Sequence, residues 1–599
     1  MKSSCWIAVT LTIASCSPSK EPMANSNTVK VEKGLSANVY FQGDSTWTIE
    51  QRMKHYGVPG VSIAVIKDNK IDWIKTYGVM NKERKEPVTT KTLFQAGSIS
   101  KPVAAYAALH VAEAGKINLD ENINTYLKSW KLPENEFTAD KKVALKHLLN
   151  HSGGITVHGF LGYSPDMPVP TLLQVLDGAP PANSPPIRID KKPEESFRYS
   201  GGGYTIMQQM LIDIEGKPFP EILRDIVLQP IGMSNSTYEQ PLTGSALGMA
   251  ATGYVPDGTM TKGERHTYPE MAAAGLWTTA EDLALFAIDV QKTFKGESNR
   301  VVSKAMAKKM LTPFVSDFVG LGLFLTKRKD NFYFGHGGWD EGFSSEMLAH
   351  RDKGYGVVVL TNSNHPEFIS ELINSVARVY GWEEYLHDFN KVDMDTAQFA
   401  LFKGRYYNGT DGSIRIFNKG AHLYLKYLKA PEADELIRIS DSSYVTTKNA
   451  RAMQFKINPK DGKLNVVFIN KDNPIEFANP KLTENVKAPY EYLLEGDYKN
   501  SLKGYQALMK TNAADNAVNE DNINQQAYFL LQSNQLSLGK NLFKINMMLY
   551  PKSANTYDSY AEACMKNGDK ALAIEYYKKA IKMNPENKGA KEKLAALEK

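Results

Sequence analysis

The chain has 599 residues, of which 42% are hydrophobic and 23% charged, and its formal net charge is +5. At roughly 100–200 residues per domain this length predicts about three to five domains, and so small a charge gives a nucleic-acid partner no electrostatic support. The three cysteines, Cys5, Cys16 and Cys564, are too few and too far apart for a disulfide scaffold or a zinc site. After the N-terminus no apolar run reaches about 18 residues, which excludes a protein with several membrane spans.

The first residues have the pattern of a bacterial secretory signal. A basic residue precedes a short apolar segment over 6–15, and Ile13-Ala14-Ser15-Cys16 resembles a lipobox. We therefore expect a signal peptide over 1–15 and a lipid on Cys16; a plain signal peptide with an incidental cysteine is the alternative. Residues 16–44 lack periodicity and are expected to be a lipid-anchored tether. These features predict a protein of the bacterial cell envelope, on the outer membrane or the periplasmic face.

Residues 45–385 are expected to form one α+β domain. Two β-rich runs, 61–66 and 71–76, flank a turn and predict a hairpin, and residues 98–114 predict a helix. The later part of the segment contains further strand-like runs and then an amphipathic helix, at 321–325, 332–334, 343–348, 355–360 and 368–380. Strands at both ends of the segment predict one antiparallel sheet with flanking helices and a helical subdomain.

Two different sequence patterns follow toward the C-terminus. Over 395–485, short alternating runs separated by turns predict a small all-β domain, a barrel or half-barrel. Residues 490–599 are helical in pattern, and Pro551 and Pro585 are 34 positions apart, which is the tetratricopeptide period. Such helix pairs usually form protein-binding surfaces, so the segment is expected to dock on the rest of the chain or on a protein partner; a plain helical hairpin is the alternative.

The first candidate for chemistry is a Ser-x-x-Lys pattern, Ser98 and Lys101, at the start of a predicted helix. The two residues are one turn apart on the same helix face. A serine hydroxyl is a weak nucleophile until a base takes its proton, and a lysine can do so if burial lowers its pKa. The same pattern begins at Ser17 and at Ser537, in the tether and in the helical repeat, so the pattern alone is weak.

Two further motifs give this pattern a context. Tyr199, within Phe197-Arg198-Tyr199-Ser200-Gly201, is placed where a loop meets a helix, and a tyrosine there can relay a proton to a leaving group. The alternative is a packed loop tyrosine. His336-Gly337-Gly338-Trp339 lies between two predicted strands, where glycines let a substrate approach and a backbone N–H can bind an oxyanion. His151, in another His-x-Gly segment, is expected to be structural.

In this order, Ser98-x-x-Lys101, Tyr199-Ser200-Gly201 and His336-Gly337-Gly338 resemble the three motifs of penicillin-recognising serine hydrolases. This family includes class C β-lactamases, D,D-peptidases, D-aminopeptidases and related esterases. The resemblance implies an acyl-enzyme mechanism in which Ser98 attacks a carbonyl while Lys101 and Tyr199 manage the protons. It also implies an oxyanion hole formed by the N–H groups of Ser98 and Trp339, and a substrate site that includes His336 and Gly338. Neither a metal nor a cofactor is expected.

The motifs depart from the β-lactamase pattern at two positions. Gly201 stands where the tyrosine motif usually ends in Asn, and His336 stands where β-lactamases usually have lysine. The substrate is therefore expected to be a small peptide amide or an ester rather than a β-lactam. A β-lactamase and a non-catalytic envelope-binding protein are the alternatives.

Overall fold

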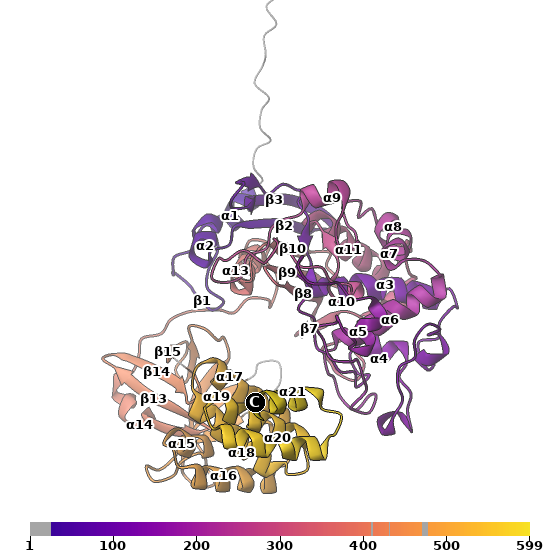
Figure 1. Ribbon diagram of the computed structural model, residues 1–599. Coiled ribbons are helices and arrows are strands. Elements are labelled where there is room, and N and C mark those ends of the chain that lie inside the picture. Colours follow the sequence, from indigo (N-terminus) through magenta and orange to yellow (C-terminus); the bar gives the residue numbers. More distant parts are fainter. Residues whose placement is uncertain (1–25, 409–410, 431, 470–476, 599) are drawn as a thin grey trace, which may run out of the picture. The chain divides into compact units, whose positions relative to one another are not determined.

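The computed structural model describes residues 26–408, 411–430, 432–469 and 477–598, and it divides into two compact units (Figure 1). The first unit contains residues 26–36 and 45–386, and the second contains residues 37–44 and the described residues from 387 onward. The expected signal peptide over 1–15 and the expected lipidation site, Cys16, lie outside the described residues. None of the helices in the described part of the chain combines the length and apolar character that a membrane span needs.

The first unit is built on a seven-stranded antiparallel sheet. In spatial order its strands are β4 (Glu86–Pro87), β3 (Lys70–Asn81), β2 (Gly60–Lys67), β10 (Gly356–Thr361), β9 (Phe343–His350), β8 (Asn331–Asp340) and β7 (Phe324–Arg328). β2, from the start of the segment, pairs with β10, from its end, so that Val61 faces Thr361 and Ile66 faces Gly356. The predicted α+β domain, with both ends in one sheet, is confirmed.

Alternation along the central strands divides their side chains between two cores. Val61, Ile63 and Val65 of β2 face a smaller core under α1 (Ser26–Glu32), α2 (Ile49–Tyr56) and α13 (Pro366–Val379). Ala64 and Ile66 of the same strand face a larger core on the other side. Figure 1 shows α1, α2 and α13 on one side of β2 and β10 and α11 (Ala280–Lys295) on the other. A strand buried on both faces therefore needs the continuous apolar run that the sequence has.

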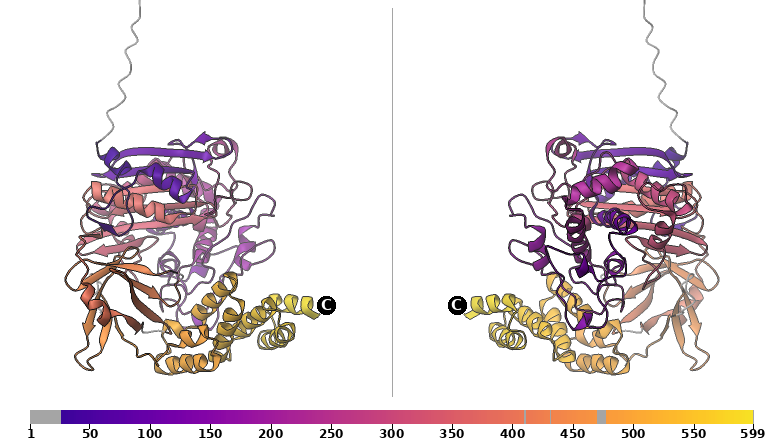
Figure 2. Two further views of the ribbon diagram at one scale, coloured as in Figure 1. Left: turned by 90° about the vertical axis from the view of Figure 1, so that its left-hand side faces the viewer. Right: turned by 90° about the vertical axis from the view of Figure 1, so that its right-hand side faces the viewer.

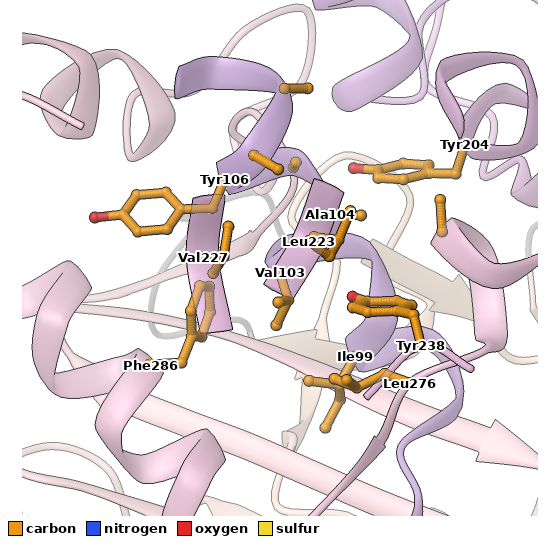
Figure 3. Packing of buried hydrophobic residues seen from close by; sticks show 14 of the residues in the cluster. Ile99, Val103, Ala104, Tyr106, Tyr204, Leu223, Val227, Tyr238, Leu276 and Phe286 are labelled. Carbon is orange, nitrogen blue, oxygen red and sulfur yellow. The ribbon is translucent and has the colours of Figure 1, made fainter. Parts of the chain in front are cut away.

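The larger core surrounds α3 (Ser100–Glu113), which is buried along almost its whole length. In Figure 3, Val103, Ala104 and Tyr106 of α3 lie among apolar side chains of neighbouring helices. The Tyr238 hydroxyl donates a hydrogen bond to the Ser100 carbonyl at 2.7 Å, at the first turn of the helix. A helix that is apolar on all sides is held by packing on all sides, so the start of α3 has a fixed position.

The remaining helices of the first unit lie between β4 and β7 in the chain. They are α4 (Leu145–Leu149), α5 (Leu172–Asp177), α6 (Gly201–Glu215), α7 (Phe219–Leu223), α8 (Gln229–Ile231), α9 (Gly244–Met249), α10 (Met271–Ala274) and α12 (Lys304–Met310). Between them, β5 (Phe94–Gln95) and β6 (Trp277–Thr278) form a two-stranded sheet. The predicted hairpin is also present, and its turn residues Asp68 and Asn69 have positive φ angles of 52° and 55°.

Two predictions of strand boundaries are wrong. The strand expected over 321–325 begins only at Phe324, because Gly322 has a φ of +100° and its N–H donates to the Leu149 carbonyl. Residues 335–339, expected between two strands, lie inside β8 and pair with β9 over their whole length. Glycines have a low strand propensity, but pairing with a central neighbour overrides it.

Residues 26–44 are folded, whereas the sequence predicted a tether over 16–44. Val31 and Leu35 are fully buried in the smaller core of the first unit. Further on, β1 (Tyr40–Phe41) pairs in parallel with β11 (Asp388–Phe389) within the second unit. The polar composition of the segment suggested a solvated linker, but a few buried apolar side chains are enough to hold it on the folded units.

The second unit contains an eight-stranded antiparallel sheet whose strands follow chain order. They are β12 (Gly404–Tyr407), β13 (Ser413–Lys419), β14 (His422–Tyr427), β15 (Asp434–Arg438), β16 (Ser443–Thr446), β17 (Ala452–Ile457), β18 (Leu464–Ile469) and β19 (Phe477–Pro480). A bridge between Tyr406 and Lys481 joins the two ends of the sheet. α14 (Phe399–Phe402) places Phe402 in the interior, where its ring stacks on Phe455 at 3.9 Å. The predicted barrel-like domain is confirmed.

Seven helices follow in the described part of this unit. They are α15 (Pro489–Leu494), α16 (Tyr498–Thr511), α17 (Glu520–Gln532), α18 (Leu536–Leu549), α19 (Ala554–Lys566), α20 (Lys570–Met583) and α21 (Lys588–Glu598). From α17 to α21 each helix packs on the next, and Figure 2 shows them as an extended row. The starts of α17, α19 and α21 are 34 residues apart, as are those of α18 and α20. The all-helical segment is confirmed, while its tetratricopeptide identity and its protein partner stay predictions.

The barrel and the helices, expected as separate domains over 395–485 and 490–599, belong to one compact unit. Arg405 of β12 forms an ion pair with Glu491 of α15 at 2.9 Å. The buried Asp411 carboxylate accepts hydrogen bonds from Lys429, at 2.7 Å, and from Tyr505 of α16. These buried polar contacts join the two parts, because removing one partner would leave a buried charge unpaired.

Candidate active site

Ser98 lies in a short 3₁₀ turn, Gly97–Ile99, that leads directly into α3. Gly97 has a φ of +52°, a conformation that favours glycine. A side chain there would also collide with β8, because a Cβ at Gly97 would lie 2.5 Å from the Trp339 nitrogen. The sequence thus brings Ser98 against a strand that is about 240 positions further along the chain.

Ser98 and Lys101 are in contact. Lys101 Nζ lies 2.9 Å from Ser98 Oγ and 2.7 Å from the Ala273 carbonyl oxygen, and the lysine is only 2% exposed. Nζ also lies 4.9 Å from the centre of the Tyr199 ring. A neutral lysine in this position can donate an N–H to Ala273 and offer its lone pair to the serine hydroxyl, which is the arrangement that a general base requires.

Tyr199 is held by aromatic packing. Its ring lies 4.3 Å from the His151 ring and 4.9 Å from the His158 ring, and it stacks on Phe324 at 6.1 Å. Within the described residues its hydroxyl makes no hydrogen bond with Ser98 or Lys101, so its contact with the lysine is through the ring face. His151 accepts the Ser200 N–H on Nδ1 at 3.1 Å, and burial lowers its pKa well below the usual range, as expected of a structural histidine.

The strand β8 presents an open edge beside Ser98. The Arg351 N–H donates to the Phe332 carbonyl, so the hydrogen-bonded pairs with β9 fall on the even-numbered residues of β8. The N–H groups of Gly337 and Trp339 therefore point toward the opposite edge. There, pairing with β7 ends at Gly335 in the described part of the chain. The Trp339 N–H is thus directed away from the sheet, next to Gly97 and Ser98, where an oxyanion donor is needed.

Gly338 makes this close approach possible. A Cβ at Gly338 would lie 1.9 Å from the Ala96 carbonyl oxygen and 2.1 Å from Ser345 Oγ. The Ser345 hydroxyl itself donates to the Ala96 carbonyl at 2.9 Å. Since Ala96 comes directly before the turn with Ser98, this contact fixes the distance between the turn and β8, and no side chain fits between them.

His336 is buried and neutral. Its Nδ1 lies 2.6 Å from the Gly337 carbonyl oxygen, which can only accept, so Nδ1 carries the proton and Nε2 has the free lone pair. Burial and the nearby Lys101 lower the pKa of His336 to about 3. At neutral pH His336 therefore carries no positive charge with which to hold an anionic group of a substrate.

Ser98 lines two cavities, which also share Tyr199 and Trp339 as lining residues. The larger one, of about 750 Å³, passes Tyr199 and His336 and continues over Gly337. The smaller one, of about 340 Å³, is bounded by Phe160 and by other residues on the side of Lys101. A carbonyl held at Ser98 would thus have room for a substituent on each side, as cleavage of a peptide amide or an ester requires.

The Beta-lactamase family profile matches residues 47–379, which is more than half of the chain. The chain belongs to the beta-lactamase family. This confirms the resemblance that the three sequence motifs indicated, and the members of the family are serine hydrolases.

Curated relatives of this beta-lactamase-family chain include the following two proteins. Protein flp of Staphylococcus aureus (strain MW2) is 24% identical over 343 residues, covering 54% of this chain and 64% of flp. The putative penicillin-binding protein PbpX of Bacillus subtilis (strain 168) is 23% identical over 326 residues, covering 51% of this chain and 74% of PbpX. The match therefore spans less than two thirds of the length of flp.

Solved structures that partly resemble this family member include the following two. The octameric penicillin-binding protein homologue from Pyrococcus abyssi is 23% identical with a TM-score of 0.49, covering 72% of this chain and 98% of its own. The D-amino acid amidase from Ochrobactrum anthropi SV3 is 20% identical with a TM-score of 0.47, covering 59% of this chain and 100% of its own.

Two contacts of this beta-lactamase-family site are absent from the sequence prediction. The Ala273 carbonyl that holds Lys101 is a backbone group, which no side-chain motif can indicate. Asp340 is 1% exposed and lines the smaller cavity, and its carboxyl lies near the Gly97 N–H. Burial raises the pKa of Asp340 well above its usual range. Its position directly after Trp339 is the one sequence signal that could have found it.

Proposed function

We propose that the protein is an exported serine hydrolase that cleaves a peptide amide or an ester through an acyl-enzyme on Ser98. The observation that supports this most strongly is the 2.9 Å contact between Ser98 Oγ and Lys101 Nζ, beside the open edge of β8. A binding protein without activity would not need a buried lysine against the serine hydroxyl, so the geometry favours an enzyme.

The proposed reaction has two steps. Ser98 Oγ attacks the carbonyl carbon while its proton moves to Lys101 Nζ, and the carbonyl oxygen becomes an oxyanion that accepts the N–H groups of Ser98 and Trp339. The proton then passes from Lys101 to the leaving group, and the bond to the leaving group breaks; a relay through Tyr199 requires its hydroxyl to come within hydrogen-bonding distance of Lys101 when the substrate binds. A water molecule attacks the acyl-serine in the second step, which releases the acid and restores the Ser98 hydroxyl.

The substrate is proposed to be an ester or a small amide of a D-amino acid rather than a β-lactam. Gly201 has no side-chain amide that could hydrogen-bond to the side chain of a β-lactam. A larger residue would also have little room there, since a Cβ at Gly201 would lie 3.0 Å from the Phe160 ring. His336 is neutral and buried, so it attracts the carboxylate of a β-lactam less than a lysine would.

The test compares kcat/KM for activated esters, D-amino-acid amides, penicillins and cephalosporins on one purified protein. A hydrogen bond to a charged group contributes about 1.5–3 kcal/mol, so its loss in the transition state slows the reaction roughly ten- to a hundredfold or more. We expect slow acylation by β-lactams and faster turnover of esters or D-amino-acid amides. Cephalosporin turnover near the diffusion limit with inert esters and amides would instead identify a β-lactamase.

A second proposal concerns location. We propose that the protein is anchored to the cell envelope by a lipid on Cys16, and the motif Ile13-Ala14-Ser15-Cys16 after a short apolar segment supports this. Two or more acyl chains on one terminus anchor a protein to a membrane through the burial of their hydrocarbon. Cys16→Ser should therefore shift the protein from the membrane fraction to the soluble exported fraction. If the parent and the Cys16→Ser protein were found in the membrane fraction to the same extent, the proposed lipid anchor would be wrong.

A further inference from the structure

The larger cavity at Ser98 extends to a carboxyl group on the opposite face of the sheet. Residues at its far end include Glu346 of β9, Ile369 of α13 and Tyr385. Gly337, on the open edge of β8 beyond the end of β7, also lines the cavity, and a Cβ at Gly337 would lie 2.8 Å from Glu346 Oε2. A side chain at this position would occupy the space in front of the Glu346 carboxyl, which glycine leaves open to the cavity.

Glu346 has no cationic partner in the described residues, and its carboxylate accepts no hydrogen bond from them. The nearby Arg328, which also lines the cavity, donates to the Tyr385 carbonyl at 2.6 Å and lies 4.7 Å from the centre of the Tyr385 ring. Burial raises the pKa of Glu346 to about 7. A half-buried carboxyl without a partner is costly, and such groups in native proteins usually have a reason.

The position of Glu346 fits a group carried by a substrate. Glu346 pairs with Gly337, and Gly337 lies two residues before Trp339, whose N–H is the proposed oxyanion donor. Two strand residues span about 7 Å. A substrate that places its carbonyl at Ser98 and extends along the open edge of β8 therefore passes over Gly337 toward the carboxyl.

We propose that Glu346 binds a cationic group of the substrate, an ammonium carried about 7 Å from the reacting carbonyl. This rests on the proposed function of Ser98 and narrows its substrate class. A neutral analogue of the same shape would leave the Glu346 carboxylate unpaired inside the cavity. The transition state of the analogue would therefore be bound more weakly than that of the cationic substrate, and its kcat/KM would be lower. Glu346 would then be a specificity-determining residue of the reaction.

The test uses two matched pairs of activated esters with the full chain. In one pair the acyl half carries either an ammonium or an apolar group of equal length; in the other pair the alcohol half does so. Assays at pH 8 keep most of the Glu346 carboxyl ionised. We expect at least one pair to show a preference of about tenfold or more in kcat/KM for the cationic member. Glu346→Gln should reduce this preference to near unity.

A matched control removes a charge without touching the cavity. Glu367 is exposed on α13, the helix that covers the far end of the cavity, and is not among its lining residues. Glu367→Gln should keep both the preference and the rate. Labelling of Ser98 by a fluorophosphonate shows whether the site of Glu346→Gln is intact, and the comparison of esters on the parent protein does not depend on any variant.

The outcomes separate the two proposals. If the parent protein hydrolyses the esters without preferring the cationic member of either pair, the role of Glu346 is overturned and the proposed function stands. If a Glu346→Gln protein is labelled normally and still prefers the cationic ester, the role of Glu346 is also overturned. If the parent protein hydrolyses no ester and Ser98 takes no label, the proposed function and the inference fail together.

Discussion

Ser98→Ala will abolish covalent labelling by a fluorophosphonate and reduce hydrolysis of every substrate to background. The variant keeps Lys101 and the open edge of β8, but it lacks the oxygen that lies 2.9 Å from Lys101 Nζ and forms the acyl-enzyme. Lys101→Met should reduce kcat/KM nearly as much as Ser98→Ala, because residues that act as one unit do not contribute additively. The measurements are labelling followed by mass spectrometry and kcat/KM on an activated ester.

The chain contains a matched control for this experiment. Ser537 and Lys540 repeat the Ser-x-x-Lys pattern at the start of α18, but Lys540 forms an ion pair with Asp569 at 2.7 Å. The Ser537 hydroxyl donates to Asn567 Oδ1 at 3.4 Å and makes no hydrogen bond with Lys540 within the described residues, so no lysine is in contact with it to act as a base. The Ser537→Ala protein should therefore be labelled by the fluorophosphonate and hydrolyse substrate at the same rate as the parent protein. Undiminished labelling of Ser98→Ala would show that the nucleophile is another residue.

Local patterns in the sequence were enough to predict that Ser98 and Lys101 lie in contact. Ser98 and Lys101 are one helical turn apart, so their contact follows as soon as the helix is recognised. The strands β2 and β10 were also predictable, because their apolar runs are continuous and bounded by turns. The fold that follows from them, one sheet shared by both ends of the segment, needed only the order of strands and helices.

Long-range packing determined what the sequence could not show. The contact of Gly97 with Trp339 and that of Lys101 with the Ala273 carbonyl join positions far apart in the chain, and one partner in each is a backbone atom. Glu346 looks like an ordinary polar residue of a strand until Gly337 is seen opposite it. The fold of residues 26–44 depends on a few buried side chains whose surroundings come from other segments.

Gly338→Ala will lower kcat/KM for the best substrate by about 100-fold or more, although alanine adds only one methyl group. Its Cβ would lie 1.9 Å from the Ala96 carbonyl oxygen, so β8 and the turn with Ser98 must move apart. Both surfaces are backbone and cannot yield as a flexible side chain could. The displacement takes the Trp339 N–H away from the oxyanion, and loss of one such donor typically costs about 10²–10³ in kcat.

The effect should appear in catalysis with the first unit still folded, because β8 keeps its pairing with β9 along the rest of its length. Circular dichroism and the thermal unfolding transition check this, and the rate of fluorophosphonate labelling reports on the oxyanion site. Gly248→Ala is the matched control, since a Cβ at Gly248 of α9 meets nothing within 4 Å and should change neither rate nor labelling. A folded Gly338→Ala protein with the parent's kcat/KM would show that the close approach of β8 to the Ser98 turn is not needed for the reaction.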